Sequence, residues 1–303
     1  MSIKKLKRPD LSVWQVGLFI FIVHFIIWMF AGNSPLVQNP YNSYVLQAEA
    51  WADGFLDLGQ NYKHLEIAEY NNQFFISFPQ FPAMVYYPFA LLGIPVPEGI
   101  IAFITAAVGG MVTFLLLKHC GVSQKCASVI SALAVCASNM LFVSVNPWVW
   151  FIAQNMCYTL TVSAIFCACK KRGFASFLLL ACAVGCRPFQ LIYTPLLCLI
   201  LMKQYNSGVK LFFKKSWWFS GAAVLGGIYM WLNFARFGNV FEFGHNYLPE
   251  FIEAPDGQFN LSYVLPNLKS LIRLPAFENG KMVFPQFNGF NMFAVSPVFA
   301  FAV

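Results

Sequence analysis

A single arginine interrupts a long apolar stretch of this chain. Arg187 is the one charged residue in 173–202, and basic clusters at 170–172 and 203–215 enclose that stretch. A guanidinium at membrane depth costs about 2.5–3.5 kcal/mol on insertion scales, so it requires an anion or a water-filled cavity. Because basic clusters beside membrane segments stay on the cytoplasmic side, both ends of the stretch are expected inside. The chain is therefore predicted to cross outward and return, turning near Arg187.

Each arm of this predicted turn is shorter than an ordinary membrane span. An arm of about 14 residues forms a helix about 21 Å long, whereas the hydrocarbon core is about 30 Å thick. Arg187 is therefore expected at the floor of a recess that opens to the outer face. A fixed cation in such a recess is suited to hold a phosphate group.

The composition is typical of an integral membrane protein. Apolar residues make up 59% of the chain and charged residues 10%, whereas soluble domains average about 25% charged residues. The net charge of +7 comes from short basic patches near the apolar runs. These patches indicate topology and a weak interaction with anionic lipid headgroups, and we expect no nucleic-acid partner.

The nine cysteines indicate neither a disulfide framework nor a metal site. All of them lie between Cys120 and Cys198, in or beside apolar runs, and none lies in the long polar loops. The sequence contains no zinc motif, phosphate-binding loop or dinucleotide fingerprint. It therefore predicts no metal ligands and does not indicate a cofactor.

The apolar runs and basic patches predict an all-α, multi-pass transmembrane bundle. We expect seven spanning helices, the first at about 12–31, and a truncated eighth that begins near Phe290. The run at 82–93 is too short to span, and treating it as an interfacial helix leaves every basic patch inside. The N-terminus is then cytoplasmic, and the large loops 32–81 and 237–288 are outside. In this interpretation residues 1–303 form a single module that lacks its C-terminal helices.

The first outer loop has predicted structure of its own. Tyr44, Ala48 and Trp51 recur at helical spacing before Gly54, which predicts a short amphipathic helix at the membrane surface. Asn71-Asn72 separates two aromatic segments and predicts a β-hairpin.

Acidic residues in this loop are candidates for a general base. Glu49 and Asp53 fit a solvated helix face, whereas Asp57 follows the predicted helix and Glu66 lies between aromatic residues. Partial burial would raise the pKa of either carboxyl group, as a base for a hydroxyl group requires. Asp57 and Glu66 are the predicted catalytic residues, with a slight preference for Asp57.

The second outer loop opens with a concentration of polar side chains among four phenylalanines. One interpretation is an aromatic belt at the membrane interface with incidental polar tips. The other is a cavity wall in which Arg236 supports Arg187 in binding phosphate. On that second interpretation the substrate-binding residues are Tyr44, Trp148, Glu242, His245 and Tyr247.

Four segments resemble, in order and spacing, those of a known enzyme family. They are NPYNSYVLQAEAWADGFLDL, NNQFFISFPQFPAMVYYPFALLG, GCRPF and NFARFGNVFEFGHNYL. The family is the bacterial family-39-like, dolichyl-phosphate-mannose-protein-mannosyltransferase-like branch of the C-type membrane glycosyltransferases. Where that pattern has an Asp-Glu pair after the first helix, this chain has Asn39-Pro40-Tyr41-Asn42.

The resemblance implies a function at the outer face of a bacterial cytoplasmic membrane. A sugar would move, with inversion, from a polyprenyl-phosphate donor to a glycan, lipid or protein acceptor, assisted by a first-loop carboxylate. Two other readings remain. One is a transporter or flippase in which Arg187 binds the substrate, and the other is an inactive membrane remnant.

Overall fold

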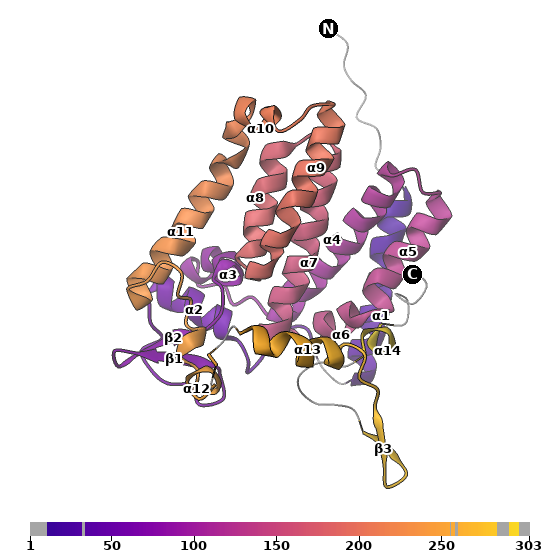
Figure 1. Cartoon of the computed structure of the whole chain (residues 1–303). Helices are drawn as coiled ribbons and strands as arrows, with labels where there is room; N and C mark the ends of the chain where they lie inside the picture. The colour runs from indigo at the N-terminus through magenta and orange to yellow at the C-terminus, as the bar shows by residue number, and fades with distance from the viewer. Residues whose placement is uncertain (1–10, 32–33, 255, 258–259, 284–290, 297–303) are drawn as a thin grey trace.

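The structure, a computed structural model, describes residues 11–31, 34–254, 256–257, 260–283 and 291–296. Helices account for 66% of the residues and strands for 5%, which confirms the predicted helical class. The two sheets are both two-stranded hairpins, and they lie in the two predicted loops. Most of the chain is an elongated helical bundle (Figure 1).

The bundle is built on three long apolar helices. They are α1 (Leu11–Ala31), α4 (Glu98–His119) and α7 (Val149–Cys169), and each is long and apolar enough to cross a membrane. Gly109 and Gly110 allow α4 to pack closely against its neighbours, because a Cβ atom at either position would overlap the Tyr158 ring or the Ile20 side chain. Small residues at such crossings are typical of membrane helix packing.

A bent pair of helices supplies a fourth candidate span. The pair consists of α5 (Gln124–Cys136) and α6 (Asn139–Val145), which meet at an angle of 56°. The sequence shows one continuous apolar run here, and the structure divides it into two helices. Ser138 explains the break, because its hydroxyl accepts a hydrogen bond from Met140 N and thereby caps a new helix.

The turn predicted near Arg187 is confirmed. Helix α8 (Gly173–Val184) ends just before Arg187, a 3-10 segment η1 (Pro188–Tyr193) follows it, and α9 (Thr194–Tyr205) leads away. Both helices have 12 residues, so they are short, as expected. The chain continues through α10 (Lys210–Lys214), η2 (Ser216–Phe219) and α11 (Ser220–Phe237).

The two ends of the bundle differ in character (Figure 1). The N-terminal end of α1 and helix α10 lie at one end, whereas α2, the first hairpin, α12 and α13 lie at the other. The basic clusters at 170–172 and 203–215 adjoin α8, α9 and α10. This arrangement agrees with the predicted separation of basic patches from the large loops. Seven crossings are more than the structure establishes, since three to four described helices are suitable spans by length and composition.

The first loop forms a layer over one end of the bundle. Its elements are α2 (Ser43–Ala52) and the strands β1 (Ile67–Tyr70) and β2 (Gln73–Ile76), and α3 (Phe81–Leu91), in the run predicted as an interfacial helix, follows directly. The predicted short helix before Gly54 and the predicted hairpin are both present. Asn71 and Asn72 both have positive φ, 52° and 59°, as a two-residue hairpin turn requires.

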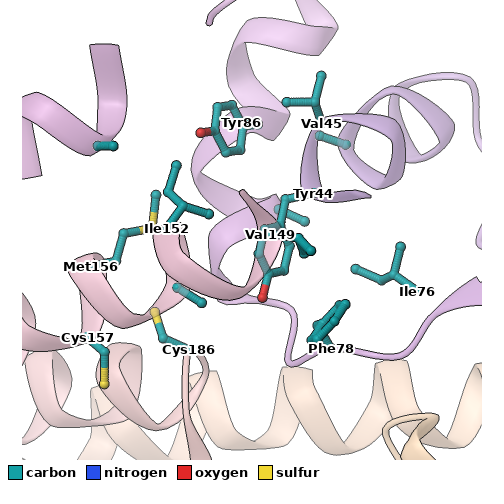
Figure 2. Packing of buried hydrophobic residues seen from close by; sticks show 14 of the residues in the cluster. Tyr44, Val45, Ile76, Phe78, Tyr86, Val149, Ile152, Met156, Cys157 and Cys186 are labelled. Atoms are coloured by element: carbon teal, nitrogen blue, oxygen red, sulfur yellow. The ribbon is translucent and has the colours of Figure 1, made fainter. Parts of the chain in front are cut away.

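Buried apolar residues fasten this layer to the bundle (Figure 2). Tyr44 of α2, Ile76 of β2 and Tyr86 of α3 belong to one cluster with Ile152 and Met156 of α7. The cluster extends to Cys186 at the end of α8, beside Arg187. The layer is therefore packed against the turn that carries Arg187.

The second loop contains short elements that follow α11. They are η3 (His245–Tyr247), α12 (Pro249–Ile252), η4 (Leu261–Tyr263), α13 (Val264–Ser270), β3 (Ala276–Glu278), β4 (Lys281–Val283) and, beyond the loop, α14 (Met292–Val295). Most of the predicted eighth helix, and the N-terminal basic patch, lie outside the described residues.

Candidate functional site

The candidate site is built around the turn that carries Arg187. Gly185 N and Arg187 N donate to carbonyl groups of α8, while Gly185 O accepts a hydrogen bond from Phe81 N of α3 at 3.0 Å. A Cβ atom at Gly185 would overlap the Tyr229 hydroxyl of α11 and approach Phe81. Because Gly185 has no side chain, α3 and α11 can pack tightly against this turn, and this packing fixes the position of Arg187.

Arg187 is half-buried, and its guanidinium makes one hydrogen bond with the described residues. Its Nη2 donates to the backbone oxygen of Trp150 at 2.6 Å, and its buried Nε has no hydrogen-bond partner in the described part of the chain. A guanidinium has five N–H donors. Most of its hydrogen-bonding capacity thus remains available for an anion.

Two pockets meet Arg187. The larger, of about 470 Å³, is formed by the turn, by Pro79 and by the second loop, and it is lined by Pro79, Arg187, Pro188, Phe189, Leu191, Ile192, Phe243 and His245. Its walls are largely apolar, and Phe189 and Ile192 are 78% and 77% exposed. A pocket with one cation and open apolar walls fits a ligand with an anionic head and an apolar body.

The second pocket at Arg187 lies between α7 and the turn. It has a volume of about 370 Å³ and is lined by Gln154, Cys157, Tyr158, Thr161, Val162, Ile165, Arg187, Gln190 and Tyr193. Thr161 Oγ1 donates to Gln190 Oε1 at 2.9 Å, so part of its polar wall is internally paired.

Tyr44 brings a buried hydroxyl to the same region. The residue is 2% exposed, and its Oη has no hydrogen-bond partner among the described residues. In Figure 2 the hydroxyl points from α2 toward the end of the cluster that contains Cys186. Burial raises the pKa of the Tyr44 hydroxyl, while the nearby Arg187 charge lowers it. A buried donor beside an arginine is well suited to a ligand oxygen.

Glu66 is the first-loop carboxylate that the structure links to Arg187, through Trp150. Trp150 Nε1 donates to Glu66 Oε1 at 3.0 Å, and Ser77 Oγ donates to the Glu66 backbone oxygen at 3.0 Å. Burial raises the pKa of the Glu66 carboxyl group, the Trp150 hydrogen bond lowers it, the Glu250 carboxylate raises it, and the Arg187 charge lowers it. The net pKa is raised, as a base for a hydroxyl group requires.

His245 is the second-loop residue of the site. Its ring lies 4.8 Å from the Phe243 ring, 5.5 Å from that of Phe251 and 5.9 Å from that of Phe78. Burial lowers the pKa of the imidazole, and the Arg187 charge lowers it further. His245 therefore favours its neutral form on the wall of the larger pocket.

Glu242 holds the backbone that presents His245. Its Oε1 accepts from Gly244 N at 2.6 Å, and its Oε2 accepts from the side chain of Asn246. Gly244 has a φ of +109°, and a Cβ atom there would meet Ser77 and Ala68 at close distance. Both carboxylate oxygens of Glu242 are thus engaged in shaping the turn.

Tyr247 connects the two loops. Its ring stacks on Phe237 at 5.3 Å and lies 4.9 Å from the ring of Tyr70 on the first hairpin. These contacts hold the hairpin that carries Glu66 against the end of α11.

Arg236, predicted as a second phosphate ligand, is directed into the protein. It is 3% exposed, and it donates to the backbone oxygens of Ile76 and Leu232 and to Asn233 Oδ1. Its guanidinium also lies 4.8 Å from the Phe237 ring. Because its donors are used within the fold, its geometry fits a strut between α11 and β2 better than a ligand for phosphate.

Asp57, the slightly preferred base, is used in a turn. Its Oδ2 accepts a hydrogen bond from Gly59 N at 3.0 Å, and within the described part of the chain it makes no hydrogen bond or ion pair with Arg187. Asp57 and Glu66 are therefore unequal in this structure, and the local contacts favour Glu66.

Trp148 lies at a separate pocket and reaches the site through aromatic contacts. Its ring is 5.4 Å from that of Tyr41, and the Tyr41 ring is 5.3 Å from that of Trp150. Trp150 is the central residue that sequence reasoning missed. Its position two residues after Trp148, at the start of a predicted helix, could have marked it as a site residue. Tryptophans at helix starts are, however, common at membrane interfaces, where they anchor the helix without a role in a site.

The site can hold an anion and deprotonate a neighbouring hydroxyl group. Among the described residues, no group of three or more His, Cys, Asp or Glu side chains could hold a metal ion. No family model, curated protein or solved structure matches the chain.

Proposed function

We propose that this protein is a membrane glycosyltransferase that uses a polyprenyl-phosphate sugar donor. The observation that carries the proposal is the pairing of Arg187 with Glu66 through a single residue, Trp150. A phosphate-binding cation and a carboxylate of raised pKa are the two groups that inverting transfer from a lipid phosphate needs.

The donor phosphate would bind at Arg187, with Tyr44 as a further hydrogen-bond donor. Both residues carry a buried polar atom without a partner in the described chain. The apolar walls of the larger pocket suit the lipid part of the donor. His245 lies on the same wall, where its ring would contact the bound donor.

Glu66 would act as the base. It takes the proton from an acceptor hydroxyl as that oxygen bonds to the anomeric carbon of the donor sugar. The bond between the anomeric carbon and the phosphate oxygen breaks, and polyprenyl phosphate leaves with the electron pair. Arg187 stabilises the charge on that phosphate in a site of low dielectric constant.

The proposal includes a seven-crossing topology with the site at the outer face. The crossings are α1, α4, α5 with α6, α7, α8, α9 and α11, and both basic clusters beside the short helices are then cytoplasmic. Helices α8 and α9 reach about 18 Å each at about 1.5 Å per residue, so Arg187 lies below the outer surface.

A transporter or flippase is the second candidate, and one observation favours it. Arg187 touches both the pocket bordered by the second loop and the pocket between α7 and the turn, as a substrate-binding cation on a path would. A carboxylate held beside the cation by Trp150 has no assigned role in that mechanism, whereas it has one in glycosyl transfer.

Membranes that contain the full-length protein would test the proposal. Radiolabelled polyprenyl-phosphate sugars would be supplied with extracted cell-envelope material, and label in a non-donor product would be measured. We expect transfer with the native protein, loss of it with Arg187→Ala, and native activity with the matched control Arg172→Ala in the cytoplasmic cluster. Movement of labelled donor across sealed vesicles without any product would instead establish the transporter.

A further inference from the structure

A third cavity lies near the layer of outer-loop elements and shares no lining residue with the two pockets at Arg187. It has a volume of about 350 Å³ and lies between the 34–40 segment, the start of α4 and the junction of α6 with α7. Its described lining residues are Trp28, Ser34, Pro35, Val37, Gln38, Asn39, Pro40, Gly99, Val145, Asn146, Pro147 and Trp148.

The lining combines side-chain amides with indole rings. Gln38, Asn39 and Asn146 supply donors and acceptors, and Trp28 and Trp148 supply aromatic surface. None of the described lining residues is charged. Sugars present hydroxyl groups around an apolar face of C–H bonds, so this combination fits a neutral saccharide.

Several groups of the cavity are fixed before any ligand binds. Asn39 Oδ1 accepts from Tyr41 N at 2.7 Å, which orients its amide and leaves Nδ2 as a donor for a ligand. Asn146 Nδ2 donates to Phe142 O at 3.0 Å, which leaves Oδ1 as an acceptor. Phe151 stacks against Trp148 at 5.4 Å and an interplanar angle of 24°.

The described lining of this cavity offers no cation to an anionic ligand. Asn39 N donates to Glu98 Oε2 at 3.3 Å, so a carboxyl group lies directly behind the cavity wall, and it is 2% exposed. Arg187 lines the other two pockets and not this one. The pockets at Arg187 therefore suit an anionic ligand, whereas the third cavity suits a neutral one.

The cavity adjoins the carboxylate of the candidate site through one aromatic row. Tyr41 contacts Trp148 at 5.4 Å and Trp150 at 5.3 Å between ring centroids, and Trp150 donates to Glu66. A ligand seated against Trp148 thus lies on the Glu66 side of the site, away from the apolar wall formed by η1.

We propose that this cavity binds a neutral saccharide. Its role as the acceptor subsite, with a sugar hydroxyl directed toward Glu66, rests on the proposed glycosyl transfer. Saccharide binding itself does not require that activity.

Ligand-observed NMR on the native protein in lipid nanodiscs would test the binding. The probes are methyl α-mannoside and methyl β-glucoside, with glucuronate as the anionic comparison. We expect saturable binding of at least one neutral glycoside and much weaker binding of glucuronate. Trp148→Ala is expected to weaken glycoside binding about tenfold or more, as for an aromatic anchor in a pocket. Trp148→Phe should retain most of the affinity.

Two further variants separate ligand loss from misfolding. Gln38→Ala changes an exposed cavity residue and should weaken binding without affecting the fold, whereas Trp217→Ala changes a 57% exposed indole outside the cavity and should bind normally. Absence of saturable binding for both glycosides would overturn the inference. Equal binding by the native protein, Trp148→Ala and Gln38→Ala would overturn it as well.

Transfer kinetics then distinguish this inference from the proposed function. We expect Trp148→Ala to raise the KM for the acceptor and leave the KM for the donor unchanged. Glycoside binding that depends on Trp148, in a protein without transfer activity, would sustain the saccharide site and refute the transferase. Transfer with an unchanged acceptor KM in Trp148→Ala, or a raised donor KM alone, would refute the acceptor subsite and sustain the transferase.

Discussion

Arg187 and Trp150 are joined by a hydrogen bond of 2.6 Å from the guanidinium Nη2 to the backbone carbonyl oxygen. The indole of the same tryptophan donates to Glu66. One residue on the first turn of α7 therefore sets the relative position of a cation from the α8–η1 turn and a carboxylate from the first loop. Because the two contacts use different atoms of Trp150, mutation can separate them.

Trp150→Phe is predicted to shift the pH dependence of transfer. The variant keeps the carbonyl group that binds Arg187 but loses the indole N–H donor. In the native protein the hydrogen bond from that indole lowers the pKa of Glu66. The pKa of Glu66 should rise, and a base must be ionised to act, so the acid limb of kcat/KM should move to higher pH. Trp148→Phe, which has no described hydrogen bond to Glu66, is the matched control. An acid limb that stays in place in Trp150→Phe would contradict the role of Glu66 as the base.

Neutralising the carboxylates should distinguish Glu66 from Asp57. A positioned general base contributes roughly 10²- to 10⁴-fold, so Glu66→Gln should lower kcat by about that factor and leave donor binding largely intact. Asp57→Asn should cost much less, because the amide oxygen can still accept from Gly59 N in its turn. Glu69→Gln, on the adjoining strand β1 and exposed, is the control for the hairpin. If Asp57→Asn abolished turnover and Glu66→Gln did not, the assignment would be reversed.

The hydrophobic pattern predicted most of the local structure. The short helix of Tyr44, the Asn71-Asn72 hairpin and the turn at Arg187 each depend on a few neighbouring residues, and all three are confirmed. The break at Ser138 was missed because a serine within an apolar run has two uses, as a side chain bonded to its own helix or as a cap.

The candidate site was less accessible to sequence reasoning. Arg187 stood out in the sequence as an isolated charge, and it lines a pocket. Arg236 carries the same charge but is buried, where it donates a hydrogen bond to Ile76 O. Asp57 and Glu66 differ in which partner the fold brings to them, namely Gly59 N nearby in sequence and Trp150 84 residues away. Long-range pairing of this kind leaves no local pattern in a single sequence.

Arg187→Lys is predicted to restore little of the transfer lost in Arg187→Ala. A planar guanidinium can donate to Trp150 O and to phosphate oxygens at once, whereas an ammonium is a point charge on a flexible stem. Steady-state transfer by purified protein in nanodiscs would measure kcat and the KM for the donor. Native turnover in Arg187→Lys would show that charge alone suffices, and native turnover in Arg187→Ala would remove the phosphate role altogether.

Replacing Arg236 should lower the stability of the protein more than replacing Arg187, although Arg187 is the residue proposed to matter more for transfer. Arg236→Met removes the side-chain donor to Ile76 O and Asn233 Oδ1 in a buried setting, and each buried unpaired group costs about 1–3 kcal/mol. Its apparent Tm in detergent should therefore fall clearly, whereas Arg187→Met, which loses one described hydrogen bond, should change Tm little. The matched pair has the same substitution in both proteins, so an equal loss of Tm would contradict the strut assigned to Arg236.

The topology predicts which side of the membrane each loop occupies. Short epitope tags inserted at Gln60 in the first loop and at Glu253 in the second should be accessible from outside in intact cells. A tag at Lys125, between α4 and α5, should become accessible only after permeabilisation, because the Lys118 to Lys125 segment is basic. An external tag at Lys125 would mean that α3 crosses the membrane. In that arrangement Arg187 would face the cytoplasm, and the donor and acceptor of the proposed reaction would have to be supplied from that side.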